Sequence, residues 1–455
     1  MFGYGLSARL VLNCYNADHY YRKYYCVMFL IHFKTLISKL PHEKLAKNTL
    51  LSLFWQSARI VTLMLWVIIL ARNFGAKGYG DFSGIAGLAT TIGSFTGCGF
   101  GLLMYRNTIQ DQNVFCSMWA KTLKMTLISG ILLSLGFVVV GMNLFVSASI
   151  KLLIPIALSE ILFYPFVTGG AFALIAKYKM GWSTSLPAFS GMLKLFAVLI
   201  YTLTVNKPQL EEYLIFHTVA TLAAAIFSIL LVSQILKPQK TLSNISWKDI
   251  NQGLGYCISW ASSNAITSID KTIILRISNS EIAGFYSTAY RFATIFMQPI
   301  DAFINAAMPK LFLRKKNPSA SKISLTLLFS TICCYSLLAG FILFFLPDVI
   351  IYILGDSFYE AAIALRWFSL LLPCYGLRLL STNILLANNN IMAKFIIELT
   401  GILVMFLLGL LLIPIFGLLG AVFMIIFTEA LIALISTTFA IMLTHTTTLM
   451  PTERL

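Results

Sequence analysis

The chain has 455 residues, of which 58% are apolar and 11% charged, and its 33 Lys and Arg against 17 Asp and Glu give a formal net charge of +16. A soluble domain carries roughly 25% charged residues, so this composition excludes a string of soluble domains, and the abundance of large apolar side chains excludes intrinsic disorder. A polytopic membrane protein remains.

The residues before the first apolar run form a separate segment, 1–48. The stretch Tyr20–Tyr25 is aromatic and basic, and the apolar run Cys26–Phe33 is too short to cross a bilayer. A signal peptide needs a longer apolar region and a small-residue cleavage site, so we expect a cytoplasmic or interfacial segment instead. Translation from Met28 is an equal alternative.

Twelve apolar segments then follow, each near the ~20 residues that a helix needs to cross a bilayer. In chain order they are 49–71, 82–104, 119–142, 152–176, 185–205, 212–236, 252–275, 283–308, 324–346, 362–386, 391–413 and 417–443. The connections are too short to fold as a catalytic domain, and the runs lack the ten-residue alternation of barrel strands. The sequence predicts an all-α membrane protein with twelve transmembrane helices.

The basic residues orient this bundle. If the N-terminus is cytoplasmic, cytoplasmic segments carry 22 Lys and Arg and the outer loops 5. Short loops rich in Lys and Arg stay on the cytoplasmic side, so both termini are expected there. Six basic residues are left inside the spans.

Two segments resemble each other at an offset of 204 residues. Arg72–Ser83 and Arg276–Ser287 share Arg, Gly and Ser at equivalent places and lie on the outer side, after spans one and seven. We therefore expect two six-helix halves in parallel repeat, with the substrate path between them. The expected parts are a first half at 49–237, a linker at 238–248, a second half at 249–443 and a cytoplasmic tail at 444–455.

Several of these residues carry a family resemblance. Lys47-Asn48-Thr49, Ala71–Gly75 and Gly78–Ser83 in the first half, with Ser268–Lys271, Gly284–Ser287, Ala289–Arg291 and Met308–Leu311 in the second, resemble the Wzx-type O-antigen flippases. These belong to the polysaccharide-transporter branch of the MOP superfamily, which also contains the MATE exporters. The resemblance covers roughly 45–443.

The resemblance implies a function. Such proteins flip undecaprenyl-diphosphate-linked oligosaccharide repeat units, of O-antigen or related surface polysaccharide, across the bacterial inner membrane by alternating access with ion coupling. Membrane lipids and the polymerase and chain-length regulator of the same pathway are the implied partners. We expect no enzymatic activity, no cofactor or metal and no nucleic acid, because the basic loops suit anionic lipid headgroups and no phosphate-binding loop motif is present.

Charged residues inside the spans are the candidate site, because a charge in lipid is costly and normally faces the bundle interior. A diphosphate suits Arg and Lys, and sugar hydroxyls suit amides. The substrate-binding candidates are Arg59, Lys194, Lys271, Arg291, Arg366, Arg378, Gln298 and Asn305. The ion-coupling candidates are Asp270, Asp301 and Glu160. Glu398 is expected to pair locally with Lys394, and Glu429 has no identifiable partner.

Helical spacing strengthens part of this set. In the eighth span, polar residues recur at steps of 4, 3, 4, 3 and 4, namely Ser287, Arg291, Thr294, Gln298, Asp301 and Asn305. Such a stripe cannot face lipid and favours the lining of a water-filled lumen, with a polar seam between packed helices as the alternative.

Two other functions fit the composition less well. A MATE-type cation antiporter would place carboxylates where its organic cations bind, whereas the candidates here are mostly basic. A membrane polysaccharide polymerase or ligase would carry a large outer loop, and the longest outer loop here, about 347–361, is short and acidic. The related lipid II flippase has fourteen spans rather than twelve.

Overall fold

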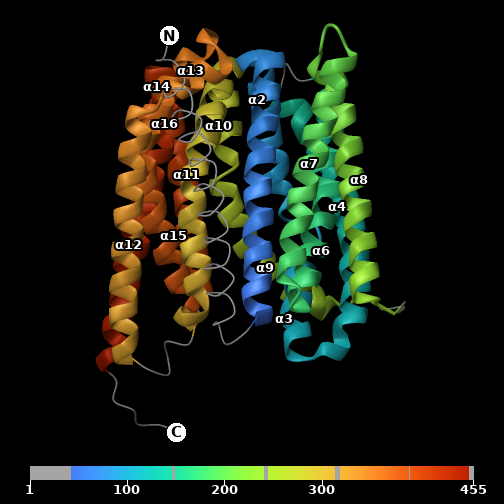
Figure 1. The fold of residues 1–455 in the computed structure, drawn as a ribbon, viewed down its shortest axis with the longest axis vertical. Helices are drawn as coiled ribbons and strands as arrows, with labels where there is room; N and C mark the ends of the chain where they lie inside the picture. Colours follow the sequence, from blue (N-terminus) through green and yellow to red (C-terminus); the bar gives the residue numbers. More distant parts are fainter. Residues whose placement is uncertain (1–42, 146–148, 240–243, 313–317, 389, 450–455) are drawn as a thin grey trace, which may run out of the picture.

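The computed structural model describes residues 43–145, 149–239, 244–312, 318–388 and 390–449, which form helices and connecting turns without a strand. Figure 1 shows the long helices running side by side, with α4, α7 and α8 on one side of α2 and α11, α12 and α16 on the other. Of the expected N-terminal segment 1–48, residues 1–42 lie outside the described residues, as does the end of the expected tail, 450–455.

The elements up to the linker are helical throughout. They are α2 Glu43–Gly93, α3 Phe100–Gln110, η1 Gln112–Val114, α4 Phe115–Leu144, α5 Ile150–Ile156, the π-helix η2 Ala157–Phe163, α6 Tyr164–Ala176, α7 Met180–Thr204 and α8 Leu210–Leu236. The break between α5 and α6 has a local cause. Pro155 has no N–H to donate within the helix, and the π-helical turn begins two residues after it.

The elements after the linker repeat this pattern of long helices with short breaks. They are α9 Trp247–Ile266, α10 Ile269–Ile277, α11 Ser280–Phe312, α12 Pro318–Phe345, α13 Val349–Leu354, η4 Asp356–Phe358, α14 Tyr359–Trp367, η5 Phe368–Leu370, α15 Leu371–Ala387 and α16 Ile391–Leu449.

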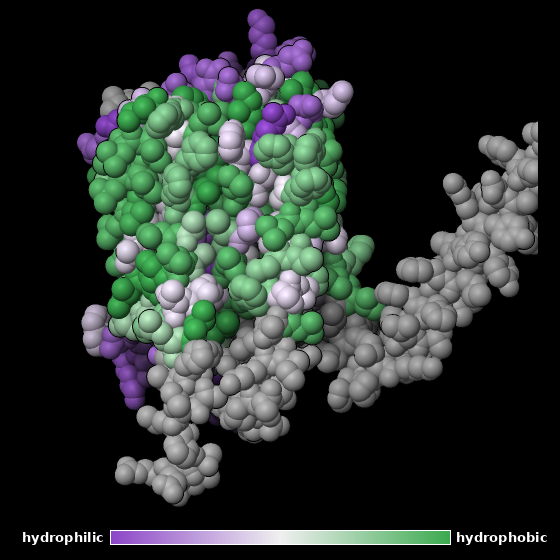
Figure 2. Space-filling view, turned by 90° about the vertical axis from the view of Figure 1, so that its left-hand side faces the viewer, coloured by the Kyte–Doolittle hydropathy of each residue, from purple (hydrophilic) through white to green (hydrophobic). Residues whose placement is uncertain are grey.

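Eight helical segments of the described chain are long and apolar enough to cross a membrane. Two of them are bent, because Gly75 in α2 and Gly417 in α16 adopt non-helical backbone angles with positive φ. Figure 2 shows a broad apolar belt with hydrophilic groups above and below it, which is the surface of a multi-pass membrane protein.

The buried apolar side chains divide along the chain. One large cluster draws almost all its members from the second half, from Ile266 to Ala440, and the clusters around Trp66 and Trp119 draw almost all of theirs from the first. Each half therefore has its own core, and polar or small residues are left to make much of the contact between them.

That contact joins residues related by the 204-residue offset. The Ser83 hydroxyl donates to the Ser287 hydroxyl at 2.8 Å. A Cβ on Gly80 would lie 1.6 Å from the carbonyl oxygen of Ser280, and a Cβ on Gly284 would lie 1.9 Å from that of Ala76, the residue equivalent to Ser280. Reciprocal contacts between equivalent residues define a local two-fold axis at this crossing of α2 and α11.

A second line of contact between the halves runs along α2, α9 and α10. The Thr272 hydroxyl donates to the Gly84 carbonyl at 2.7 Å, and the Asn264 side chain donates to the Ser94 hydroxyl at 3.2 Å. Further along, a Cβ on Gly99 would lie 2.1 Å from the Gly253 carbonyl oxygen, so the two backbones touch there.

Candidate functional site

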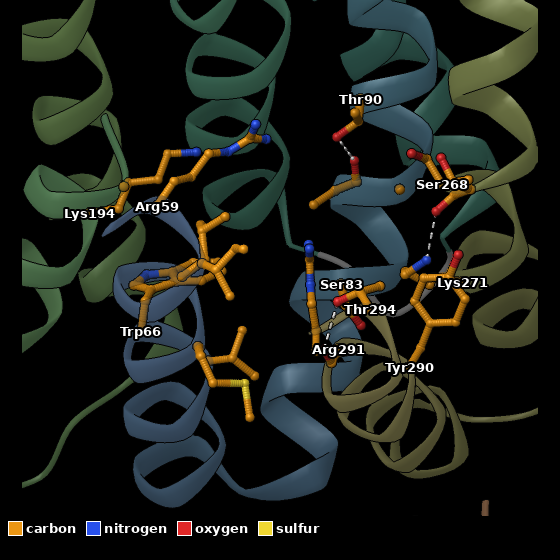
Figure 3. Close-up of a pocket in the computed structure, with 18 of the residues that line it drawn as sticks. Arg59, Trp66, Ser83, Thr90, Lys194, Ser268, Lys271, Tyr290, Arg291 and Thr294 are labelled. Atoms are coloured by element: carbon orange, nitrogen blue, oxygen red, sulfur yellow. Dashed lines mark hydrogen bonds between the residues drawn. The ribbon is translucent and has the colours of Figure 1, made fainter. Parts of the chain in front are cut away.

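A cavity of about 390 Å³ lies between the two halves (Figure 3). Its first-half wall comes from α2, η2, α6 and α7, and its second-half wall comes from α10, α11, α15 and the break before α10. Figure 3 shows Arg59 and Lys194 on one wall, Lys271 and Tyr290 on the other, and Arg291 between them. Seven of the candidate residues line it, namely Arg59, Lys194, Lys271, Arg291, Gln298, Asp301 and Glu160.

The polar stripe of α11 faces this cavity over most of its length. Arg291, Thr294, Gln298 and Asp301 are lining residues. Ser287 lies at the two-fold contact instead, and the side chain of Asn305 lies outside the described part of the chain. Since α11 turns the stripe toward the gap between the halves, lipid is kept away from it.

The lining carries more positive than negative charge, with four cations against the carboxylates Glu160 and Asp301. Within the described side chains, neither Arg59 nor Arg291 forms an ion pair. The Nε of Arg291 is also buried without a hydrogen-bond partner there. Two guanidinium groups that lack an ion pair among the described side chains suit an anionic guest in this cavity.

Lys194 belongs to a different arrangement. Its Nζ donates to Oε1 of Glu160 at 2.8 Å and lies 5.2 Å from the centre of the Tyr164 ring. Glu160 sits in the π-helical turn after Pro155, which brings its carboxylate to the cavity wall, and His217 of α8 contacts the same Oε1 at 3.1 Å.

Lys271 is held more firmly. Its Nζ donates to both carboxylate oxygens of Asp270, at 2.9 and 3.1 Å, and to the carbonyl of Thr267 at 2.9 Å. That carbonyl lies at the break between α9 and α10, so Lys271 satisfies a backbone group that the broken helix leaves open. Asp270 is fully buried behind it and also accepts a hydrogen bond from Tyr286 at 2.7 Å.

Asp301 has no ion-pair partner among the described side chains and accepts a hydrogen bond from the Tyr375 hydroxyl at 2.7 Å. Tyr375 also lines the cavity, so an α11 carboxylate and an α15 phenol meet at its wall. These groups, with Gln298 nearby on the stripe, offer both acceptors and donors to a hydroxyl-rich guest.

The other two cationic candidates lie elsewhere. Arg366 is exposed, with its guanidinium 5.8 Å from the centre of the Phe344 ring, and it does not line the cavity. Arg378 is buried and hydrogen-bonded to Glu429 on α16. The 3₁₀ turn η5 interrupts the helix between the two arginines.

The expectations for two other buried carboxylates, Glu398 and Glu429, had different outcomes. The expected local pair of Lys394 and Glu398 is confirmed at 3.6 Å, and Ser262 and Ser263 also bind that carboxylate. Glu429 has a partner in Arg378, contrary to expectation. His217 was not among the candidates because it belongs to no cluster of histidines in the sequence, yet it is fully buried against Glu160.

Comparisons with known proteins agree with this geometry. A profile of the polysaccharide biosynthesis protein family matches residues 45–312, and the chain belongs to that family. The resemblance stated from the sequence is thereby confirmed. No curated protein matches the sequence closely enough to add to this.

Solved structures of similar shape include transporters and a flippase. A multidrug resistance MATE transporter of the MOP superfamily, in its inward-facing conformation, matches with a TM-score of 0.67 and 15% identity over 86% of this chain and 95% of the other. The lipid II flippase MurJ, in an inward closed conformation, gives 0.68 and 15% over 86% and 87%. A MOP transporter from Pyrococcus furiosus, described as having a binding pocket of reversed polarity, gives 0.60 and 16% over 88% and 94%. The chain therefore shares the fold of these proteins.

Proposed function

We propose that this protein is a flippase for undecaprenyl-diphosphate-linked oligosaccharide repeat units, of O-antigen or a related surface polysaccharide such as that of lipopolysaccharide. It would carry them across the bacterial inner membrane by alternating access. Membership of the polysaccharide biosynthesis family and a fold shared with a lipid II flippase support the class of substrate.

The single observation that carries the proposal is the cationic cavity between the halves. Arg59 and Arg291, which lack ion pairs among the described side chains, suit the two phosphates, with Lys194 and Lys271 beside them. Gln298, Asp301 and Tyr375 suit the sugar hydroxyls. An organic cation would be repelled by the net positive charge of this lining, so a MATE-type cation antiporter accounts for the lining less well.

The proposed topology has twelve spans in two halves, 49–237 and 249–443, with both termini cytoplasmic. The bent candidate spans Leu50–Gly93 and Ile391–Met442 have 44 and 52 residues, long enough to cross a ~30 Å hydrocarbon core twice each. The more polar α9–α10 unit and α11 supply the remaining two crossings. Several of their polar residues face the cavity or the other half, among them Lys271, Gln298 and Asn264, and these residues lower their hydropathy.

The ion-coupling residues are proposed to lie among Asp270, Asp301 and Glu160. Glu160 and Asp301 line the cavity, whereas Asp270 is reached only through Lys271. The polymerase and the chain-length regulator of the pathway are proposed as partners that take over the exported unit.

A deletion strain tests the function. It should accumulate lipid-linked repeat units in the cytoplasmic leaflet, detected by their resistance to a membrane-impermeant glycosidase or periodate in intact spheroplasts. Unchanged surface polysaccharide in a strain that lacks any redundant flippase would refute the proposal.

A further inference from the structure

Three groups at and behind the first-half wall of the cavity are in contact with one another through a carboxylate. Lys194 of α7 and His217 of α8 both contact Oε1 of Glu160, at 2.8 and 3.1 Å. Glu160 and Lys194 line the cavity, and His217 is fully buried behind them. The diphosphate-binding role proposed above uses Lys194 but gives no reason for the histidine.

We propose that Glu160, held by His217, is a proton site that fills when Lys194 leaves it for the substrate diphosphate, so that one proton binds together with each substrate molecule. This rests on the proposed function, because it needs a diphosphate in the cavity. It adds that proton binding and substrate binding favour each other, and it assigns His217 the role of positioning the Glu160 carboxylate.

The hydrogen bonds of Lys194 make it the exchangeable cation. Among the described residues its ammonium makes one hydrogen bond, to Glu160, although it has three N–H donors. Lys271 on the opposite wall is bound by both oxygens of Asp270 and by the Thr267 carbonyl. Lys194 can therefore turn toward a phosphate by breaking one hydrogen bond, whereas Lys271 would have to break three.

The contacts behind Glu160 suit a neutral imidazole at His217. The indole Nε1 of Trp66 can only donate, so its 2.7 Å contact with the Tyr213 hydroxyl makes that oxygen an acceptor. The Tyr213 oxygen lies 3.3 Å from Nδ1 of His217, so its hydroxyl can donate to that nitrogen, and Nε2 then carries the hydrogen that is donated to Glu160. This chain is complete with a neutral imidazole and an ionised carboxylate.

Departure of Lys194 leaves that carboxylate with one neutral donor in a buried site. The described groups that face it are Lys194 from α7 and His217 from α8, with Tyr213 behind the imidazole and Tyr164 of α6 beneath the lysine. No other cation among them contacts Glu160, and an uncompensated buried charge is strongly unfavourable. A proton from the bulk solution then bonds to Oε2, which accepts no hydrogen bond from the described residues, and the Lys194 ammonium pairs with the diphosphate.

Calorimetric titration of the purified full-length chain in nanodiscs tests this coupling. The probe is a short-chain prenyl-diphosphate-N-acetylglucosamine, whose two phosphates are both esterified and keep constant charge across roughly pH 6 to 8. Titration in buffers of different ionisation enthalpy counts the protons taken up. We expect about one proton per probe molecule, and a Kd that rises by up to tenfold per pH unit.

Variants separate the proton site from substrate binding. Glu160→Gln should bind the probe without proton uptake and with a Kd that does not change with pH. Lys194→Met should bind more weakly and also without uptake, because Glu160 is then already protonated. The matched control is Glu398→Gln, which alters a buried Lys–Glu pair away from the cavity and should keep the uptake of the unmodified protein.

Each outcome decides between the proposals. Probe binding without proton uptake by the unmodified protein, or unchanged uptake by Glu160→Gln, overturns the coupling and leaves the flippase proposal intact. Absence of probe binding to the unmodified protein, in a preparation that is monodisperse and melts cooperatively, overturns both.

Discussion

The close crossing of α2 and α11 should not tolerate a side chain at Gly80. A Cβ there would lie 1.6 Å from the Ser280 carbonyl oxygen, whereas ordinary contacts begin at 3.4 Å, so Gly80→Ala must push the helices about 1.8 Å apart. Overpacking of a well-packed core costs about 1–3 kcal/mol, and this clash meets backbone rather than an adaptable side chain, so we expect the upper end of that range.

The separation would also stretch the Ser83–Ser287 hydrogen bond, which is 2.8 Å long. We expect Gly80→Ala to lower the midpoint of thermal unfolding in detergent, measured by tryptophan fluorescence, and Gly284→Ala to do the same. Gly136→Ala is the control, because nothing lies within 4 Å of its added Cβ and alanine favours the helix by up to about 1 kcal/mol. Equal midpoints for Gly80→Ala and Gly136→Ala would refute the reasoning.

Three further predictions address charged groups. Arg291→Gln should reduce glycan export at least tenfold because it removes an uncompensated cavity cation, whereas the exposed Arg366→Gln should complement a deletion strain fully; equal export by both would contradict the site. Arg378→Leu should destabilise by about 3–5 kcal/mol by leaving Glu429 buried and unpaired, and adding Glu429→Leu should restore most of the melting midpoint. Partial burial disfavours ionisation of Asp249, but its hydrogen bonds with Lys121 and Ser246 outweigh this and lower its pKa, so its stabilising contact is lost only as the pH falls through that lowered value. The melting shift caused by Lys121→Met should therefore stay constant between roughly pH 5 and 8.

Helical periodicity indicated the polar face of α11 from the sequence, because residues three and four apart share a side whatever packs against it. Four residues of that face, namely Arg291, Thr294, Gln298 and Asp301, line the cavity. The same spacing placed Ser287 on the stripe, but it could not show that Ser287 lies at the two-fold contact, where its hydroxyl accepts a hydrogen bond from Ser83.

Contacts between different helices could not be predicted from the sequence. Arg378 and Glu429 lie 51 positions apart and His217 and Glu160 lie 57 apart, so no local spacing links them. The pair of Lys394 and Glu398 was predictable because the two residues are four positions apart on one helix. Hydropathy likewise indicated the apolar segments, but it could not show that α2 and α16 continue through their bends at Gly75 and Gly417.

The two-fold contact between α2 and α11 has a consequence for how its two sides can vary. In a pair of identical six-helix chains, one substitution would alter both sides of the axis at once, whereas in this single chain each side varies alone. Asp81 accepts a hydrogen bond from Ser280, while the equivalent positions across the axis hold Phe285 and Ala76, which offer only apolar side chains. The crossing is two-fold in its backbone but carries this side-chain hydrogen bond on one flank, so its two flanks need not separate with equal ease.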